Sequence, residues 1–149
     1  ARRSRADGRK GTQREMRTPS DKIRVLAAVV QRDGRYLICQ RPEEKRHGLY
    51  WEFPGGKLEA GEDHGAAAVR ELKEELNLTV LNVGTILYSA NDPGSSFIVD
   101  FVNVEVDGIP VLHEHCQLLW LKVEELKELK LAPSDLSFLE NYLLPLSNS

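Results

Sequence analysis

The chain has 149 residues, of which 41% are hydrophobic and 29% are charged, so it can form one folded domain with its own core. Residues 1–20 hold seven arginine and lysine residues against two acidic ones, a net charge of +5. Since the whole chain has a net charge of −3, residues 21–149 carry a net charge of −8. Such an acidic domain is a poor clamp for long nucleic acid, and no apolar run approaches the roughly 20 residues that span a bilayer. Neither is therefore expected as a partner.

Residues 1–20 contain almost nothing apolar and are predicted to be a disordered basic arm. The alternative is a cloning remnant that precedes a native start at Met16. Their arginine content would suit a transit peptide, but they lack an amphipathic stripe. The folded domain is therefore expected to occupy residues 21–149.

Several strands are expected along this domain. Residues 23–30 and 35–40 are apolar, β-rich runs on either side of Asp33-Gly34, a dipeptide typical of a type I′ hairpin. A second strand pair is predicted at residues 79–90 and 97–106, and another strand at residues 116–122. Between them, residues 41–62 form a long loop of the kind that compact domains usually keep for function.

The two cysteines, Cys39 and Cys116, fall in strand-like segments and are expected to be small core residues. Two cysteines do not make a disulfide framework. The composition therefore favours a reducing, cytoplasmic compartment.

Two helices are predicted. The first begins near Asp63, whose carboxylate is a good N-cap, and the second runs over residues 134–144. The second helix is expected to bury Leu136, Leu139 and Leu143, which lie at helical spacing.

The first helix carries the most informative feature of the chain. Three glutamates lie on one face at the spacing i, i+3, i+4: Glu71, Glu74 and Glu75. An opposing apolar stripe is expected from Val69, Leu72 and Leu76. Like charges at this spacing repel unless a cation lies among them, and oxygen ligands suit a hard cation such as Mg²⁺ or Mn²⁺. The alternative is a solvated acidic face without a ligand.

Residues 56–78 resemble the Nudix box, in which a glycine, a glutamate and the run Arg-Glu-apolar-any-Glu-Glu follow in fixed register. The matching positions are Gly56, Glu62, Arg70, Glu71, Leu72, Glu74, Glu75 and Leu78. Asn77 replaces the last glycine of the box, and asparagine also tolerates the left-handed backbone that ends a helix. The resemblance implies a Nudix fold, an α/β/α sandwich around a mixed β-sheet, and hydrolysis of a nucleoside diphosphate linked to another moiety.

This resemblance also implies roles for single residues. Glu71, Glu74, Glu75 and Glu114 are expected to be catalytic, and the metal ligands are expected to be Glu71, Glu75, Glu114 and the carbonyl of Gly55. Glu114 lies in a His-Glu-His run, and the alternative there is a transition-metal site or solvent-exposed loop histidines, His113 and His115.

Further roles concern phosphate and support of the glutamates. Arg41 matches a substrate-binding arginine by its spacing to Phe-Pro-Gly-Gly, although a surface arginine would look the same, and Lys57 is placed to neutralise phosphate oxygens. Arg70 is expected to orient the glutamates by pairing with Glu74 at i+4. Glu62 is expected to anchor the loop or to cap the helix.

Outside the box, the resemblance extends over roughly residues 23–144 to the MutT-like and CTP pyrophosphohydrolase branch of the family. The matching segments are residues 40–42, 48–56, 113–120 and 131–135. In that branch an aspartate at the position of Asp135 reads the base, while a helix N-cap is the alternative. Phe97, Tyr50 and Trp51 are the candidates for stacking on the base, and of these Trp51 is expected in the core.

Together these features favour a Mg²⁺-dependent nucleoside triphosphate pyrophosphohydrolase, with Mn²⁺ able to substitute. Its substrates would be oxidised or modified nucleotides such as 8-oxo-dGTP, or pyrimidine nucleotides. Its role would be to remove damaged nucleotides from the nucleotide pool. The alternatives are an ADP-ribose hydrolase, because Pro93 lies near where that subfamily keeps a proline, and a non-catalytic nucleotide-binding module. A monomer or a homodimer is expected.

Overall fold

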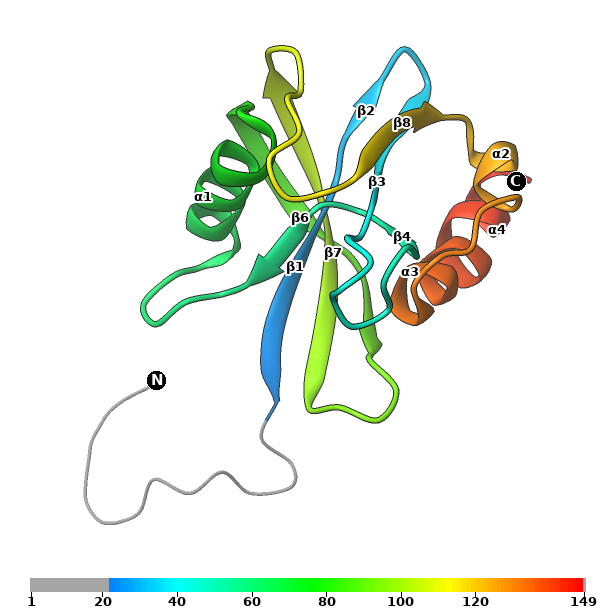
Figure 1. Cartoon of the computed structure of the whole chain (residues 1–149), viewed down its shortest axis with the longest axis horizontal. Coiled ribbons are helices and arrows are strands. Elements are labelled where there is room, and N and C mark those ends of the chain that lie inside the picture. Colours follow the sequence, from blue (N-terminus) through cyan, green and yellow to red (C-terminus); the bar gives the residue numbers. More distant parts are fainter. Residues whose placement is uncertain (1–21, 149) are drawn as a thin grey trace.

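Two β-sheets form the middle of the molecule, with helices on both sides (Figure 1). The computed structural model describes residues 22–148, so the expected basic arm at residues 1–20 lies outside the described residues. The first sheet has the strand order β5–β1–β7–β6. Its strands are β5 (Gly55–Lys57), β1 (Ile23–Val29), β7 (Phe97–Asp107) and β6 (Thr79–Asn91).

This first sheet is mixed, as the resemblance implies. β1 pairs parallel with β7, in a register that runs from Ile23 opposite Phe97 to Val29 opposite Asn103. β5 and β6 pair antiparallel with β1 and β7. The expected strand boundaries at residues 79–90 and 97–106 each fall one residue short of the observed ends.

The second sheet is built around β3 (Arg35–Gln40), which pairs with β2 (Gln31–Arg32), β4 (Trp51–Glu52) and β8 (Gln117–Leu121). The hairpin between β2 and β3 turns at Asp33 and Gly34, whose φ angles of 55° and 75° fit the expected type I′ turn. The strands β4 and β5 lie inside the segment expected to be a loop, because their pairing partners are distant in sequence.

The helices form the outer layers. α1 (His64–Leu76) covers one side, and α2 (Val123–Leu126), α3 (Pro133–Phe138), the π-helical turn η1 (Leu139–Leu143) and α4 (Leu144–Ser147) cover the other (Figure 1). Alternate residues of β1 serve the two layers. Leu26 and Ala28 pack in the cluster that holds the inner face of α1, whereas Ala27 and Val29 pack in the cluster that holds Phe138. This arrangement is the expected α/β/α sandwich.

Two apolar faces differ from expectation. Val69 is 52% exposed, because the buried face of α1 is made by Ala67, Ala68, Leu72 and Leu76 together with Glu75. In the C-terminal helices Leu136 is 41% exposed and Phe138 is fully buried in its place, while Leu139 and Leu143 are buried as expected. The π-helical turn after Phe138 changes the phase of the helix, so a single 3.6-residue period does not describe it.

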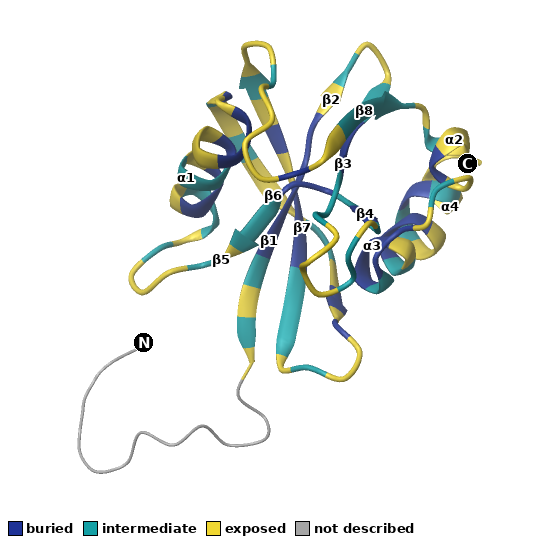
Figure 2. Ribbon diagram, in the orientation of Figure 1, coloured by how far each residue is buried: buried dark blue, intermediate teal, exposed yellow. Residues whose placement is uncertain are grey.

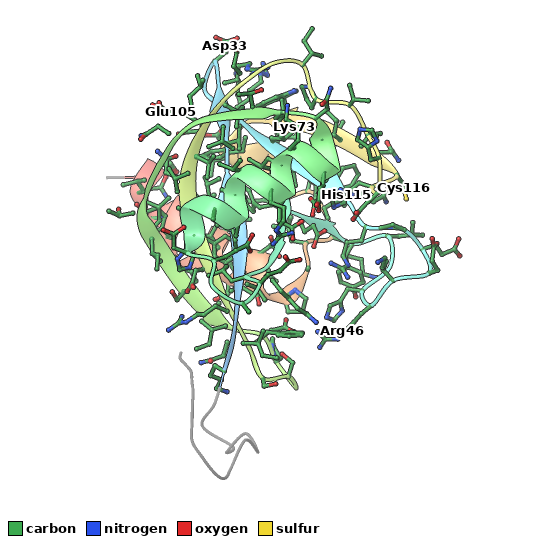
Figure 3. All side chains as sticks on the ribbon, turned by 90° about the vertical axis from the view of Figure 1, so that its left-hand side faces the viewer. Asp33, Arg46, Lys73, Glu105, His115 and Cys116 are labelled. Carbon is green, nitrogen blue, oxygen red and sulfur yellow. The ribbon has the colours of Figure 1, made fainter. Side chains whose placement is uncertain are left out.

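One cysteine also departs from its expected place. Cys39 is buried, but Cys116 is exposed just before β8 (Figure 3). Figure 2 shows that burial concentrates where the helices meet the sheets. Among the described residues, no helix has both the length and the apolar character needed to cross a membrane.

Candidate active site

The helix that carries the three glutamates begins and ends at the residues the sequence predicts. The carboxylate of Asp63 accepts a hydrogen bond of 2.8 Å from the backbone N–H of Ala66. At the other end, Asn77 adopts a left-handed φ of 56°, and its N–H donates to the carbonyl of Lys73. These two ends set the length of α1, and its buried residues set which face meets the sheet.

Two glycines of β5 let this face approach the sheet closely. A Cβ on Gly56 would lie 2.2 Å from Oε2 of Glu71, and a Cβ on Gly55 would lie 1.9 Å from the carbonyl oxygen of Leu26. The N–H of Gly55 donates to Oε1 of Glu75 over 3.3 Å. A side chain at Gly56 would therefore push the carboxylate of Glu71 away from the strand, and one at Gly55 would clash with the backbone of β1.

Glu75 is a buried carboxylate among other carboxylates. It is 5% exposed. Burial, then a hydrogen bond with Glu71 and repulsion from Glu71, Glu52 and Glu114, raise its pKa to about 10. Negative charge therefore converges on one point, which a bound cation would relieve.

A cavity of about 110 Å³ opens at this point. Its lining includes Gly55, Glu75 and Glu114, three of the four expected metal ligands, with Lys45 and His115 beside them. Figure 3 shows His115 close to one end of α1.

The other glutamates of the cluster lie at its border. Nη1 of Arg70 lies 3.0 Å from Oε2 of Glu71. The side chain of Glu74 is 58% exposed and lies 3.6 Å from the same guanidinium, so it is the most weakly held of the three.

Arg70 is held mainly by a partner other than the expected Glu74. Its Nε and Nη2 donate to the two carboxylate oxygens of Glu62 over 2.7 and 2.8 Å. The hydrogen bond from Arg70, followed by one from the N–H of Glu59, lowers the pKa of Glu62 to about 2. Glu62 therefore does not cap the helix; through Arg70 it fixes the position of Glu71.

The oxygen donors of this region suit a hard divalent cation. Among residues 22–148, no three His, Cys, Asp or Glu side chains already lie in a coordinating arrangement. Arg70 engages Glu71, and Glu75 is hydrogen-bonded to the same carboxylate. The chemistry of these donors fits such an ion, which Glu71, Glu75 and Glu114 would hold together with the carbonyl of Gly55.

A second, larger cavity of about 310 Å³ adjoins the first. Both are lined by Arg41, Glu52 and Gly55. The larger cavity has apolar walls from Val25, Ala27, Phe97 and Val99, and its polar groups include Ser134 and Asp135. Mainly apolar walls with a few polar groups are typical of a small-molecule site.

Lys57 and Phe97, which the sequence predicts for different roles, lie together in this larger cavity. Nζ of Lys57 is 5.1 Å from the centre of the Phe97 ring. Lys57 does not contribute to the lining of the smaller cavity. Trp51 is 9% exposed and packs in the core, as expected.

Asp135 is buried in the lining of the larger cavity and does not cap α3. The N-cap residue of α3 is Ala132, so the alternative reading of Asp135 is wrong. One carboxylate oxygen of Asp135 accepts a hydrogen bond of 2.9 Å from the N–H of Phe53. Burial, and next the charge of Glu52, raise the pKa of Asp135 well above its usual value.

Glu52 joins the two cavities and was missed by the sequence analysis. Its Oε1 lies 2.7 Å from Nη1 of Arg41, and its Oε2 lies 2.8 Å from Nε2 of His115. His115 is therefore buried, whereas only His113 has the exposure expected of a loop histidine. The position of Glu52, directly before the Phe-Pro-Gly-Gly motif, was the available signal.

The raised pKa of Glu75 predicts how the metal-free protein responds to pH. Because this pKa is raised from 4.5 to about 10, its contribution to stability is complete below about pH 4.5 and is lost as the pH rises towards 10. In EDTA, the melting temperature of the wild type should therefore fall between pH 6 and 9 relative to that of Glu75→Gln. Parallel melting curves for the two proteins across this range would contradict the assignment.

The comparisons with known proteins cover the same residues. The sequence model of the NUDIX domain matches residues 21–142. The CTP pyrophosphohydrolase of Escherichia coli (strain K12) is 38% identical over 124 residues, which cover 81% of this chain and 91% of that protein. The putative 8-oxo-dGTP diphosphatase 2 of Mycobacterium tuberculosis (strain ATCC 25618 / H37Rv) is 30% identical over 128 residues, with coverages of 84% and 91%.

Among solved structures, the solution structure of the E. coli ORF135 protein is similar to this chain. The TM-score is 0.71 at 36% sequence identity, and the match covers 87% of this chain and 94% of that chain. The match therefore extends over most of the two sheets and the helices on both sides of them, and is not limited to the helix of the Nudix box.

Proposed function

The chain belongs to the NUDIX domain family and is a Nudix hydrolase, and we propose that it cleaves nucleoside triphosphates to a nucleoside monophosphate and pyrophosphate. The observation that supports this reaction is the junction of two different cavities at Arg41, Glu52 and Gly55. The larger cavity suits a nucleoside, with Phe97 to stack on its base and Asp135 to read the base edge. The smaller one, with its glutamates, suits the phosphate chain.

The smaller cavity would hold a divalent cation. The carbonyl of Gly55 and the carboxylates of Glu71, Glu75 and Glu114 are the proposed ligands, with Mg²⁺ as the natural ion and Mn²⁺ as a substitute. When bound, the ion would neutralise charge on the phosphate oxygens. Glu74, the exposed carboxylate of the cluster, completes the proposed catalytic set.

The remaining residues bind or position. Arg41 borders both cavities and is the proposed phosphate ligand, and Lys57 adds a second positive charge beside Phe97. Glu62 and Arg70 hold Glu71 in place.

The substrate class is proposed from the relatives and from Asp135. The named activities of two relatives are those of a CTP pyrophosphohydrolase and a putative 8-oxo-dGTP diphosphatase. A carboxyl group accepts from the N4 amino group of cytosine when ionised and can also donate when protonated. Oxidised or modified purine nucleotides and pyrimidine nucleotides are therefore the proposed substrates, in cleaning of the nucleotide pool.

The setting of the enzyme is part of the same proposal. Cys39 and the exposed Cys116 are both free thiols, which suits a reducing, cytoplasmic compartment. We expect a monomer or a homodimer, with a nucleotide as the ligand and neither long nucleic acid nor membrane as a partner.

The two alternative functions are less well supported. Pro93, which suggested an ADP-ribose hydrolase, lies in a turn after β6. Proline and glycine are common in turns because of their backbone conformations, so the turn alone explains Pro93 and Gly94. A non-catalytic binding module would gain nothing from burying Glu75 beside three other carboxylates.

The products separate these functions. CTP, dCTP, dGTP and 8-oxo-dGTP should yield monophosphate and pyrophosphate, with little orthophosphate at early times and no turnover in EDTA. Anion-exchange chromatography of timed samples would identify the products. A higher kcat/KM for ADP-ribose, with AMP and ribose 5-phosphate as products, would favour the competing hydrolase instead.

A further inference from the structure

The segment from Arg41 to Tyr50 forms a closed loop beside the larger cavity. Its two ends are tied by backbone hydrogen bonds, from the N–H of Arg41 to Tyr50 and from the N–H of Leu49 to Arg41. The Nε of Arg41 also donates to the carbonyl of Arg46 over 2.6 Å. The loop is therefore anchored at its base and at its tip to an arginine that borders both cavities.

The tip of this loop is joined to a distant turn by an ion pair. Nη1 of Arg46 lies 2.5 Å from Oδ2 of Asp92, and Nη2 donates to the carbonyl of Pro93 over 3.2 Å. Arg46, labelled in Figure 3, and Asp92 both line the larger cavity, and they come from two separate segments, the 41–50 loop and the turn between β6 and β7. The pair therefore bridges the cavity rim.

Asp92 links this bridge to the inner end of the cavity. It is 8% exposed, and its other carboxylate oxygen accepts a hydrogen bond of 3.3 Å from the hydroxyl of Ser134, the neighbour of Asp135. Ser95 donates to the oxygen that Arg46 engages. One carboxylate thus connects the loop, the turn and the start of α3.

The closed position of the loop carries conformational costs. His47 and Leu49 have φ angles of 57° and 67°, in the left-handed region that side chains disfavour. Within the described residues, Nε2 of His47 is buried without a hydrogen-bond partner. Contacts at the tip of the loop, such as those of Arg46, offset these costs.

The Arg46–Asp92 pair is suited to be a reversible contact of this kind. The side chain of Arg46 is 49% exposed, so its ion pair is weakened by solvent and by salt. We propose that Arg46 and Asp92 form a latch that holds the 41–50 loop closed over a bound nucleotide, and that nucleotide entry and product release require this pair to open. The proposal rests on the proposed function, since it assigns the larger cavity to the nucleoside.

Breaking the latch should accelerate release without unfolding the protein. CTP in EDTA is the probe, with its dissociation rate measured by stopped-flow tryptophan fluorescence. Arg46→Ala and Asp92→Asn should each increase this rate roughly threefold to fivefold, the range expected for a surface ion pair. Asp92→Asn keeps an amide oxygen for Ser134, so its melting temperature serves to check the fold.

Coupling between the two variants separates a latch from independent damage. The double variant should release CTP no faster than either single variant. Added NaCl should accelerate release from the wild type more than from Arg46→Ala. Arg35→Ala, an arginine on the β2–β3 hairpin, is the matched control and should behave as the wild type does.

Two negative results have different meanings. Unchanged release in both single variants, or effects that simply add in the double variant, would overturn the latch while the wild type still binds and hydrolyses nucleotides. A wild type that neither binds nor hydrolyses CTP, dGTP or 8-oxo-dGTP would overturn the proposed function itself, and the latch with it.

Discussion

Glu75→Gln should keep the fold and lose most of the hydrolytic activity, by roughly 10²–10³-fold in kcat, by analogy with the loss of one preorganised electrostatic contact. The amide keeps the shape of the side chain and can still accept from the N–H of Gly55. It removes one negative charge from the proposed ligands of a divalent cation. The variant should therefore bind Mg²⁺ more weakly, so that it needs a higher Mg²⁺ concentration, and its turnover should be lower.

The same substitution should stabilise the metal-free protein near neutral pH. Burial and three neighbouring carboxylates disfavour the ionised form of Glu75, and glutamine cannot ionise. Added Mg²⁺ should reverse this order, because the ion stabilises the state that binds it and should raise the melting temperature of the wild type more. A site kept for ligand binding at a cost in stability would show this pattern.

The measurements are pyrophosphate release over a Mg²⁺ titration and thermal melting with Mg²⁺ or EDTA. Glu105→Gln removes an exposed carboxylate from β7 and is the control for a change of net charge. Turnover by Glu75→Gln at the wild-type rate would rule out Glu75 as a metal ligand.

The parts of this site that the sequence predicts depend on local spacing. The register of Glu71, Glu74 and Glu75 follows from the helical period, and the cap at Asp63 and the left-handed Asn77 follow from the chemistry of helix ends. The existence of β1 and β3 follows in the same way from the apolar runs on either side of Asp33-Gly34. Such features need no knowledge of tertiary contacts.

The parts that the sequence did not predict depend on contacts between distant segments. Glu52 and His115 are 63 positions apart, and Arg46 and Asp92 are 46 positions apart. The burial of Glu75 also required the fold, because β5 lies against that side of α1, where the N–H of Gly55 donates to Glu75 and Gly56 closely approaches Glu71. A charged residue with helical spacing gives no sign of whether solvent or a strand will face it.

The second large effect is expected at Asp135, where Asp135→Asn should change base preference while leaving metal dependence unchanged. One carboxylate oxygen is occupied by the N–H of Phe53, and an asparagine oxygen can accept that hydrogen bond equally well. The N–H of Asp135 itself also engages the carboxylate, and the oxygen that Phe53 does not occupy is the one that we expect to face the base. Asparagine presents a donor there at every pH, whereas the carboxyl group donates only when protonated.

This difference predicts a dependence on pH. Burial and the charge of Glu52 raise the pKa of Asp135, so its protonated form persists to a higher pH than usual and gives way to an acceptor-only carboxylate as the pH increases. The wild type should therefore prefer different bases at low and high pH. The asparagine variant should keep the preference that the wild type has at low pH.

The experiment is a set of kcat/KM values for CTP, dCTP, dGTP and 8-oxo-dGTP between pH 6 and 9, on both proteins. One hydrogen bond to a base edge discriminates by roughly 1–3 kcal/mol, so the CTP to 8-oxo-dGTP ratio should differ between the proteins by about tenfold to a hundredfold at high pH. Asp107→Asn, an exposed carboxylate at the end of β7, is the matched control. Equal losses on all four nucleotides, or no change on any, would leave Asp135 as a structural residue that only anchors Phe53.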